Sequence, residues 1–177
     1  MRVLAIDFET ADTGRDSACA IGAVLIEDGC IADRFYRLIR PPRRRVMFTA
    51  IHGIRWPDVA DQPCFGELWP ALAPLVAAAD LFAAHNAGFD RGVLIGCCEA
   101  YGIEAPDRPW LCTVKLSRAL WDIRPTRLPN VCEHFGIPLN HHDALSDALA
   151  CAEIARRALL EGYDLARGHL APRRVAA

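Results

Sequence analysis

The sequence predicts an α/β fold, in which a five-stranded mixed sheet is flanked by helices. Apolar runs of strand length come first, and helical and strand-like segments alternate after them, which is the order expected of a sheet with helices packed on its faces. The 177 residues are 53% hydrophobic and 24% charged, as in an ordinary globular protein. A chain of this length is most simply one domain. We expect that domain to span residues 1–166, with residues 167–177 as a flexible tail.

Three strands are predicted at the start of the chain. The apolar runs that indicate them are Val3–Phe8, Ala18–Glu27 and Cys30–Ile39. The turn signal Asp28-Gly29 joins the second run directly to the third, so we expect an antiparallel meander. The segment Arg40–Arg45, which contains two prolines, then ends the meander as an exposed loop.

The rest of the chain alternates between helical and strand-like patterns. Phe65–Val76 has apolar residues at helical spacing, but Pro70 and Pro74 favour a kink or an early end. Leu81–Ala84 has the length and composition of a buried strand. The remaining predicted elements are a helix that ends at Tyr101, a strand at Pro109–Thr113, and helices at Val114–Trp121, Leu128–Phe135 and Asp143–Leu160.

Composition limits the compartment and the possible partners. The eight cysteines show no paired ligand spacing, which favours free thiols in a reducing cytoplasm. The N-terminus lacks the shape of a signal peptide, and no apolar stretch is long enough to span a bilayer, so we expect no membrane partner. The formal net charge is −2. A nucleic-acid partner must therefore be argued from a local patch or from bound metal ions.

The first chemical motif is the pair Asp7 and Glu9 at the end of the first predicted strand. Side chains at i and i+2 of a strand point to the same face, so the two carboxylates project together. Such convergence is unfavourable unless a cation lies between the carboxylates. The pair therefore predicts a divalent metal site and metal-assisted chemistry on a phosphate. Taken alone, the pair is explained equally well as two solvated side chains at a strand end.

The second motif, His85–Asp90, follows the fourth predicted strand. It combines a small-residue turn, an aromatic residue and a carboxylate near a helix start. A purely structural explanation is available, in which Asn86 and Gly88 shape the turn, Phe89 packs in the core and Asp90 complements the helix dipole. His85 is expected to be structural in either case.

The third motif joins His142 to Asp147. His142 precedes the last predicted helix and Asp147 lies in its early turns, an arrangement that suits a general base beside a metal ligand. Asp143 has a simpler assignment as the helix N-cap or as an acid of the first turn. The adjacent His141 is an alternative candidate for the base.

Together the three motifs resemble the DnaQ-like family of 3′–5′ exonucleases, the DEDDh branch of the ribonuclease H-like fold. The family's Asp-x-Glu-Thr, His-Asn-x-x-Phe-Asp and His-x-x-x-x-Asp motifs match residues 7–10, 85–90 and 142–147 in order and approximate spacing. The segment Ile51-His52-Gly53-Ile54 is also similar to a His-Gly-Ile segment of polymerase proofreading subunits.

The resemblance implies a catalytic site and a reaction. Two Mg²⁺ or Mn²⁺ ions would be held by the carboxylates, and a histidine would act as the base; these five residues are Asp7, Glu9, Asp90, Asp147 and His142. The terminal nucleotide would contact Thr10, Ile51, His52 and Phe89. The reaction would release nucleoside 5′-monophosphates from the 3′ end of single-stranded nucleic acid, with DNA favoured over RNA.

Several alternatives stay open at this point. Ile51 and Phe89 are equally well explained as ordinary core residues. The arginines from Arg37 to Arg45, with Arg55, are candidates for steering a phosphate backbone, although a solvated loop explains the Arg43–Arg45 run more simply. A non-catalytic nucleic-acid-binding or polymerase-associated module on the same fold, and a metalloprotein unrelated to nucleic acid, are competing functions. A DNA polymerase or repair complex is an expected partner, and the sequence predicts no oligomeric state.

Overall fold

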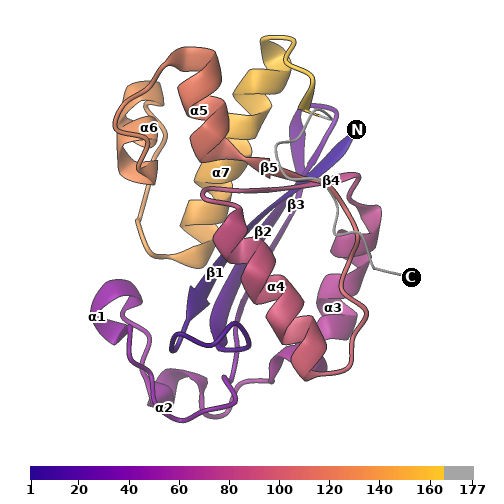
Figure 1. Ribbon diagram of the computed structural model, residues 1–177, viewed down its shortest axis with the longest axis vertical. Coiled ribbons are helices and arrows are strands. Elements are labelled where there is room, and N and C mark those ends of the chain that lie inside the picture. The colour runs from indigo at the N-terminus through magenta and orange to yellow at the C-terminus, as the bar shows by residue number, and fades with distance from the viewer. Residues whose placement is uncertain (166–177) are drawn as a thin grey trace.

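The computed structural model describes residues 1–165, so the tail predicted at 167–177 lies outside the described residues. The described chain forms a five-stranded sheet in the order β3-β2-β1-β4-β5, with helices around it (Figure 1). All eight cysteines are free thiols. Within the described part of the chain, no helix has both the length and the apolar character needed to cross a membrane.

The strands agree closely with the predicted ones. The antiparallel meander consists of β1 (Arg2–Thr10), β2 (Ala18–Glu27) and β3 (Cys30–Leu38). The short strands β4 (Leu81–Ala84) and β5 (Trp110–Cys112) extend the sheet in parallel with β1. The β2–β3 turn needs two residues with positive φ, which Asp28 at 50° and Gly29 at 80° provide. Strand β1 continues two residues beyond the predicted end, so Glu9 lies within the strand and shares its rigidity.

The structure contains seven helices among the described residues. Their bounds are α1 (Thr49–His52), α2 (Trp56–Val59), α3 (Phe65–Ala78), α4 (Gly88–Ala100), α5 (Thr113–Trp121), α6 (Leu128–Phe135) and α7 (Ala144–Leu160). The first two residues of the segment at 51–54 complete the helical turn α1, and Gly53 caps it. Helix α6 matches its prediction and ends at Gly136, whose φ of 64° is the left-handed conformation that glycine favours.

The expectation of an early end in α3 is wrong. The helix runs for 14 residues through both Pro70 and Pro74. Both prolines lie on the exposed side, whereas Phe65, Leu68 and Leu72 are buried on the opposite side against the sheet. Burial of a large apolar side chain stabilises the fold by about 1.5–3 kcal/mol. The buried side of α3 therefore offsets the loss of the backbone hydrogen bonds that the two exposed prolines remove.

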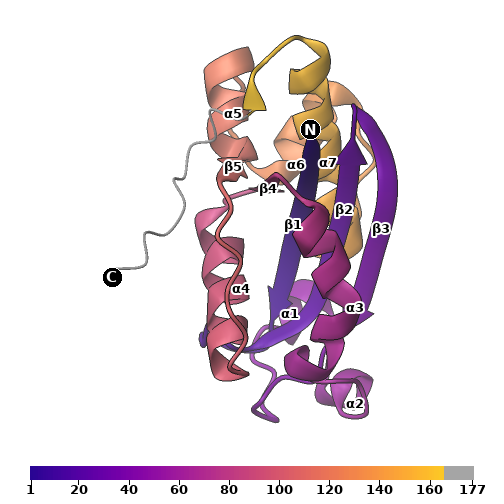
Figure 2. The same cartoon turned by 90° about the vertical axis from the view of Figure 1, so that its right-hand side faces the viewer.

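Two apolar layers enclose the sheet. Alternate residues of β1 point to opposite faces: Leu4 and Ile6 pack with α3 and α4, while Val3 and Ala5 pack with α5, α6 and α7. Figure 2 shows α3 in front of the strands, α4 to their left, and α6 and α7 behind them. A smaller cluster around Val59 anchors α2 near the end of β1. The carboxyl end of β1 is thus the place where both helical layers and the α1–α2 segment meet.

Intramolecular contacts hold several arginines that were considered for phosphate steering. Arg43 forms ion pairs with Asp12, through Nε at 2.7 Å, and with Asp16. The Arg44 guanidinium lies over the Trp56 ring. The other contacts are Arg40 with Glu67, Arg55 with Asp58, and Arg37 over the Phe35 ring. Arg43, Arg44 and Arg45 are exposed, as predicted for a solvated loop, and Arg43 also ties this loop to the β1–β2 connection.

Candidate active site

Four carboxylates that are distant in the sequence meet at the carboxyl end of β1. Asp7 and Glu9 come from β1, and Asp147 comes from the first turns of α7; their carboxylate oxygens lie within 4.8 Å of one another. Asp90 joins them from the first turn of α4, where its Oδ1 accepts the Phe8 N–H at 3.0 Å. The acidic residues of all three sequence motifs therefore form one cluster.

The parallel pairing of β4 with β1 explains how Asp90 reaches the cluster. Both strands point toward the same end of the sheet, so the segment after β4 emerges beside Asp7. Asn86 takes the left-handed conformation at φ 75° and turns the chain into α4, which begins at Gly88. Asp90 is only 2% exposed, and its hydrogen bond to the β1 backbone fixes the start of α4 against the strand.

Gly22 explains how α7 comes close enough to place Asp147. Gly22 pairs with Asp7 across the β1–β2 ladder. A Cβ at this position would lie 2.0 Å from the carbonyl oxygen of Ala144, in the first turn of α7. Only a residue without a side chain allows the helix to rest directly on β2 beside Asp7. Sequence reasoning did not single out Gly22, although a glycine within a strand pattern often marks such a close backbone approach.

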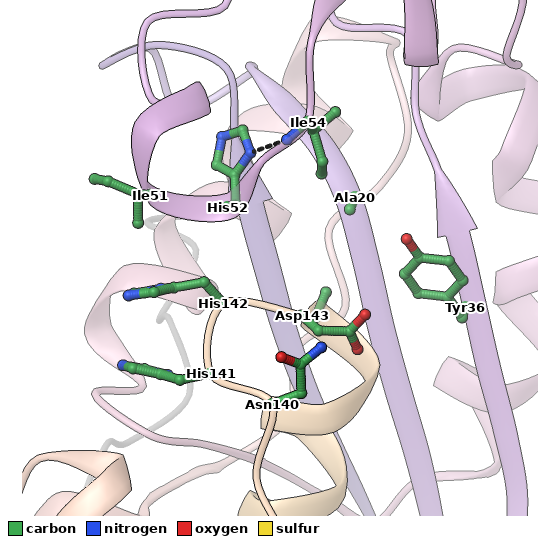
Figure 3. Close-up of a pocket in the computed structure, with 10 residues that line it drawn as sticks. Ala20, Tyr36, Ile51, His52, Ile54, Asn140, His141, His142 and Asp143 are labelled. Carbon is green, nitrogen blue, oxygen red and sulfur yellow. Dashed lines mark hydrogen bonds between the residues drawn. The ribbon is translucent and has the colours of Figure 1, made fainter.

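The loop before α7 directs two histidines toward the cluster. His141 Nδ1 lies 3.0 Å from Asp147 Oδ2, and the His142 backbone N–H donates to the same oxygen at 3.1 Å. His142 has a φ of 69°, and its ring stacks on that of His141 with centroids 3.8 Å apart. Figure 3 shows the two rings extending side by side, below Ile51 and His52 of α1. Asp143 caps the helix by accepting the Ser146 N–H, as predicted.

A cavity of about 300 Å³ opens onto the acidic cluster. Its walls contain all four predicted substrate-contact residues, Thr10, Ile51, His52 and Phe89. Ile51 is 53% exposed and Phe89 is 39% exposed, so the alternative that they are ordinary core residues is wrong. His52 is held in place because its Nε2 lies 3.2 Å from the Thr10 carbonyl oxygen. Phe48 also lines the cavity, and sequence reasoning missed it because it precedes the recognised segment.

Burial and mutual repulsion raise the pKa values of the clustered carboxyl groups. The pKa of Asp7 lies well above its usual value, because of burial first and then the charges of Asp90, Asp147 and Glu9. Burial, with the charges of Asp147 and Asp90, raises the pKa of Glu9 to about 8. Burial raises the pKa of Asp90 to about 7, although the Phe8 N–H acts in the opposite direction. The pKa of Asp147 is also raised by burial. The cluster therefore opposes full ionisation at neutral pH unless cations neutralise it.

The residues fit a divalent cation. Asp147 is 4% exposed, and its Oδ1 has no hydrogen-bond partner within the described structure. A buried carboxylate oxygen without a partner is unfavourable, and coordination of a cation would satisfy it. Carboxylate oxygens are the ligands that Mg²⁺ and Mn²⁺ prefer.

His85, the first residue of the second motif, supports the site from within the fold. Its Nδ1 lies 2.9 Å from Thr113 Oγ1, and its Nε2 lies 2.9 Å from the Thr126 carbonyl oxygen. Burial lowers the pKa of His85 to about 4, so the ring is neutral at pH 7. Both ring nitrogens are engaged, which agrees with the structural role expected from the sequence.

The chain matches the exonuclease family of the RNase T type over residues 4–155. It is 32% identical over 157 residues to DNA polymerase III PolC-type from Thermotoga petrophila, a match that covers 86% of this chain and 11% of the relative. The chain therefore spans about a tenth of the length of that relative.

Two solved structures have similar folds. Exonuclease X in complex with 5′ overhanging duplex DNA is 27% identical with a TM-score of 0.70, and the match covers 92% of this chain and 93% of that one. The nuclease domain of 3′hExo, a DEDDh family member bound to rAMP, is 18% identical with a TM-score of 0.76, and the match covers 99% and 97% of the two chains. These matches confirm the predicted fold with its mixed five-stranded sheet.

Replacement of Gly22 by alanine tests how the cluster is positioned. The Gly22→Ala variant must push α7 away from β2, so we expect it to bind Mg²⁺ roughly 10-fold more weakly by calorimetric titration. The matched control is Gly66→Ala, whose Cβ would lie 2.7 Å from the Tyr101 ring in the opposite layer. The control should lose thermal stability without losing Mg²⁺ affinity. Equal Mg²⁺ affinity in Gly22→Ala and the wild type would contradict this account.

The raised carboxyl pKa values predict how the stability of the metal-free protein depends on pH. Between about pH 6.5 and 8, folded Glu9 and Asp90 retain protons that the unfolded chain has released, so stability falls as pH rises. The slope is up to about 1.4 kcal/mol per pH unit for each proton. Below pH 6.5, the lowered pKa values of His52, His85 and His142 act in the opposite direction.

The measurement is urea unfolding in EDTA at several pH values in this window. Mg²⁺ should flatten the slope, because the ion stabilises the ionised carboxylates. Asp7→Asn should also reduce the slope, because one repelling charge is absent. Stability that stays constant or rises between pH 6.5 and 8 would contradict the electrostatic account.

Proposed function

The chain belongs to the RNase T-type exonuclease family, and from this we propose that it is a metal-dependent 3′–5′ exonuclease. In this proposal it releases nucleoside 5′-monophosphates from the 3′ end of single-stranded nucleic acid. The observation that carries the proposal is a cavity whose walls include Asp7, Glu9, Asp147, His141 and His142, with Asp90 buried beside it. We favour DNA over RNA because relatives include a DNA polymerase and a DNA-bound exonuclease, although another neighbour binds rAMP.

The carboxylates are proposed to hold two Mg²⁺ or Mn²⁺ ions. Such ions, when bound, stabilise negative charge on a phosphate and lower the pKa of water. Four ionised carboxylates carry four negative charges, which two divalent ions would balance. The proposed ligands are Asp7, Glu9, Asp90 and Asp147. Their rigid placement on β1, α4 and α7 limits the reorganisation that binding requires.

His142 is proposed as the general base that takes a proton from the attacking water. Burial and the neighbouring His141 lower its pKa below 6.5, so the ring is neutral and able to accept a proton at pH 7. Among the described residues, the His142 ring makes no hydrogen bond, whereas His141 Nδ1 is engaged by Asp147. This difference favours His142 over the alternative His141.

The cavity walls support the proposed contacts with a terminal nucleotide. Ile51 and Phe89 present exposed apolar surface on which a base of any sequence can stack. Arg15 lies over the Phe89 ring and donates from Nη1 to the Phe89 carbonyl at 3.2 Å, which orients the aromatic wall. His52 and Thr10 are proposed to contact the sugar and phosphate, because they join the apolar walls to the acidic cluster.

The competing non-catalytic function has no specific support. A module that only binds nucleic acid would not need four converging carboxylates, since their charge repels phosphates when no cation is present. The matching segment of the PolC-type relative is one part of a DNA polymerase chain. We therefore include association with a DNA polymerase or repair complex in the proposal.

The Asp7→Asn variant tests the metal-dependent reaction. This isosteric change removes one proposed ligand charge, so we expect it to abolish degradation of a 5′-labelled single strand in Mg²⁺ or Mn²⁺. EDTA should abolish the wild-type reaction in the same way. Thermal stability in EDTA should be unchanged or higher, because one repelling charge is absent. Degradation by the variant at the wild-type rate would refute the site assignment, and parallel assays on DNA, RNA and dinucleotides would define the substrate.

The His142→Ala variant tests the general base. Loss of a base typically lowers turnover by roughly 10²–10⁴-fold, and we expect a decrease in that range with little change in KM. The control is His134→Ala, which removes an exposed imidazole from α6, away from the cluster. Turnover equal to that of the control would rule out His142 as the base.

A further inference from the structure

A second set of potential metal ligands overlaps the carboxylate cluster. His141, His142 and Asp147 each offer a ligand atom, and these atoms lie within 4.8 Å of one another. His141 Nδ1 and Asp147 Oδ2 are 3.0 Å apart, close to the separation of two atoms that bind the same ion. This set shares only Asp147 with the set formed by Asp7, Glu9 and Asp147, and it has imidazole nitrogens in place of the two carboxylates of β1.

The backbone places the two imidazoles beside Asp147. The left-handed conformation of His142, at φ 69°, brings its N–H to Asp147 Oδ2 and leaves its ring stacked on His141 at an angle of 22°. The two rings point in the same direction in Figure 3. Asp147 is 4% exposed and its Oδ1 lacks a hydrogen-bond partner in the described structure. The His141 side chain is 37% exposed, so an ion can reach the set from solvent.

The ligand atoms of this set favour a different ion from the one that the carboxylate cluster favours. Imidazole nitrogen suits Zn²⁺ and similar transition-metal ions, whereas Mg²⁺ requires oxygen ligands in octahedral geometry. Zn²⁺ often binds three protein ligands, with water in the fourth position of a tetrahedron. Two imidazoles and one carboxylate meet that requirement.

We propose that His141, His142 and Asp147 form a Zn²⁺-binding site and that occupation of this site inhibits the enzyme. Asp147 belongs to both ligand sets, so Zn²⁺ competes with the ions of the carboxylate cluster. Coordination also occupies the nitrogen lone pair with which His142 would accept a proton. The inhibitory consequence rests on the proposed function, whereas Zn²⁺ binding itself does not.

The binding test uses the full chain after removal of metal ions. Zn²⁺ affinity is measured by competition with a chromogenic chelator for the wild type, His141→Ala and His134→Ala. We expect His141→Ala to weaken binding by about 10-fold or more, since loss of residues that merely support ligands already costs 10–100-fold. His134→Ala, which removes an exposed imidazole of α6, should bind as the wild type does.

Co²⁺ identifies the ligands directly. Substitution of Co²⁺ for Zn²⁺ should give the absorption of a nitrogen- and oxygen-ligated ion, without the thiolate charge-transfer band of a cysteine site. This control is needed because Cys30 is an exposed thiol. A thiolate band, or equal Zn²⁺ affinity in His141→Ala and the wild type, would overturn the proposal.

Inhibition is then measured at fixed Mg²⁺, with each variant compared with its own rate in the absence of Zn²⁺. The inhibitory Zn²⁺ concentration should rise at least about 10-fold in His141→Ala, in step with the loss of affinity. If the protein binds Zn²⁺ through His141 but shows no nuclease activity under any condition, the proposed function is refuted. The proposed Zn²⁺ site then still stands. Tight Zn²⁺ binding without inhibition would overturn the inhibitory role.

Discussion

The mutual repulsion of four carboxyl groups at the carboxyl end of β1 constrains how the whole fold is built. Asp90, Asp147 and Glu9 are between 2% and 9% exposed, and burial raises their pKa values. Repulsion by neighbouring carboxylates raises the pKa values of Glu9 and Asp90 further. The arrangement is unfavourable for an isolated fold and favourable for a protein that binds cations. The apolar layers on both faces of the sheet must supply the stability that this cluster removes.

The strand register and the helix packing turn this constraint into a defined site. Asp7 pairs with Gly22, and the absence of a side chain at Gly22 lets α7 approach until Asp147 reaches the strand. The hydrogen bond from Phe8 to Asp90 fixes α4 at the same position from the other face. Each acid is therefore placed by backbone contacts of regular elements, which move less than loops do.

Local signals made much of the fold predictable from the sequence. Strand β2 and helix α6 match their predicted bounds because a turn or a glycine closes each of them. The predicted early end of α3 was wrong because a rule based on the prolines alone does not take into account the buried apolar side chains on the opposite side of the helix. The convergence of the acids followed from the motifs. The role of Gly22 could not be predicted from the motifs, because it depends on contact with Ala144, 122 positions later in the chain.

Two of the four residues proposed for substrate contact, Ile51 and His52, are held by a different part of the fold from the acids. The acids lie on β1, α4 and α7, whereas Ile51 and His52 lie on α1, outside the sheet. Arg43 ties the segment before α1 to the β1–β2 connection, and the Val59 cluster anchors the segment after it. This segment contains no strand of the sheet. Substitutions within it can therefore reshape the cavity wall while the acids keep their positions and the proposed metal ligands stay unchanged.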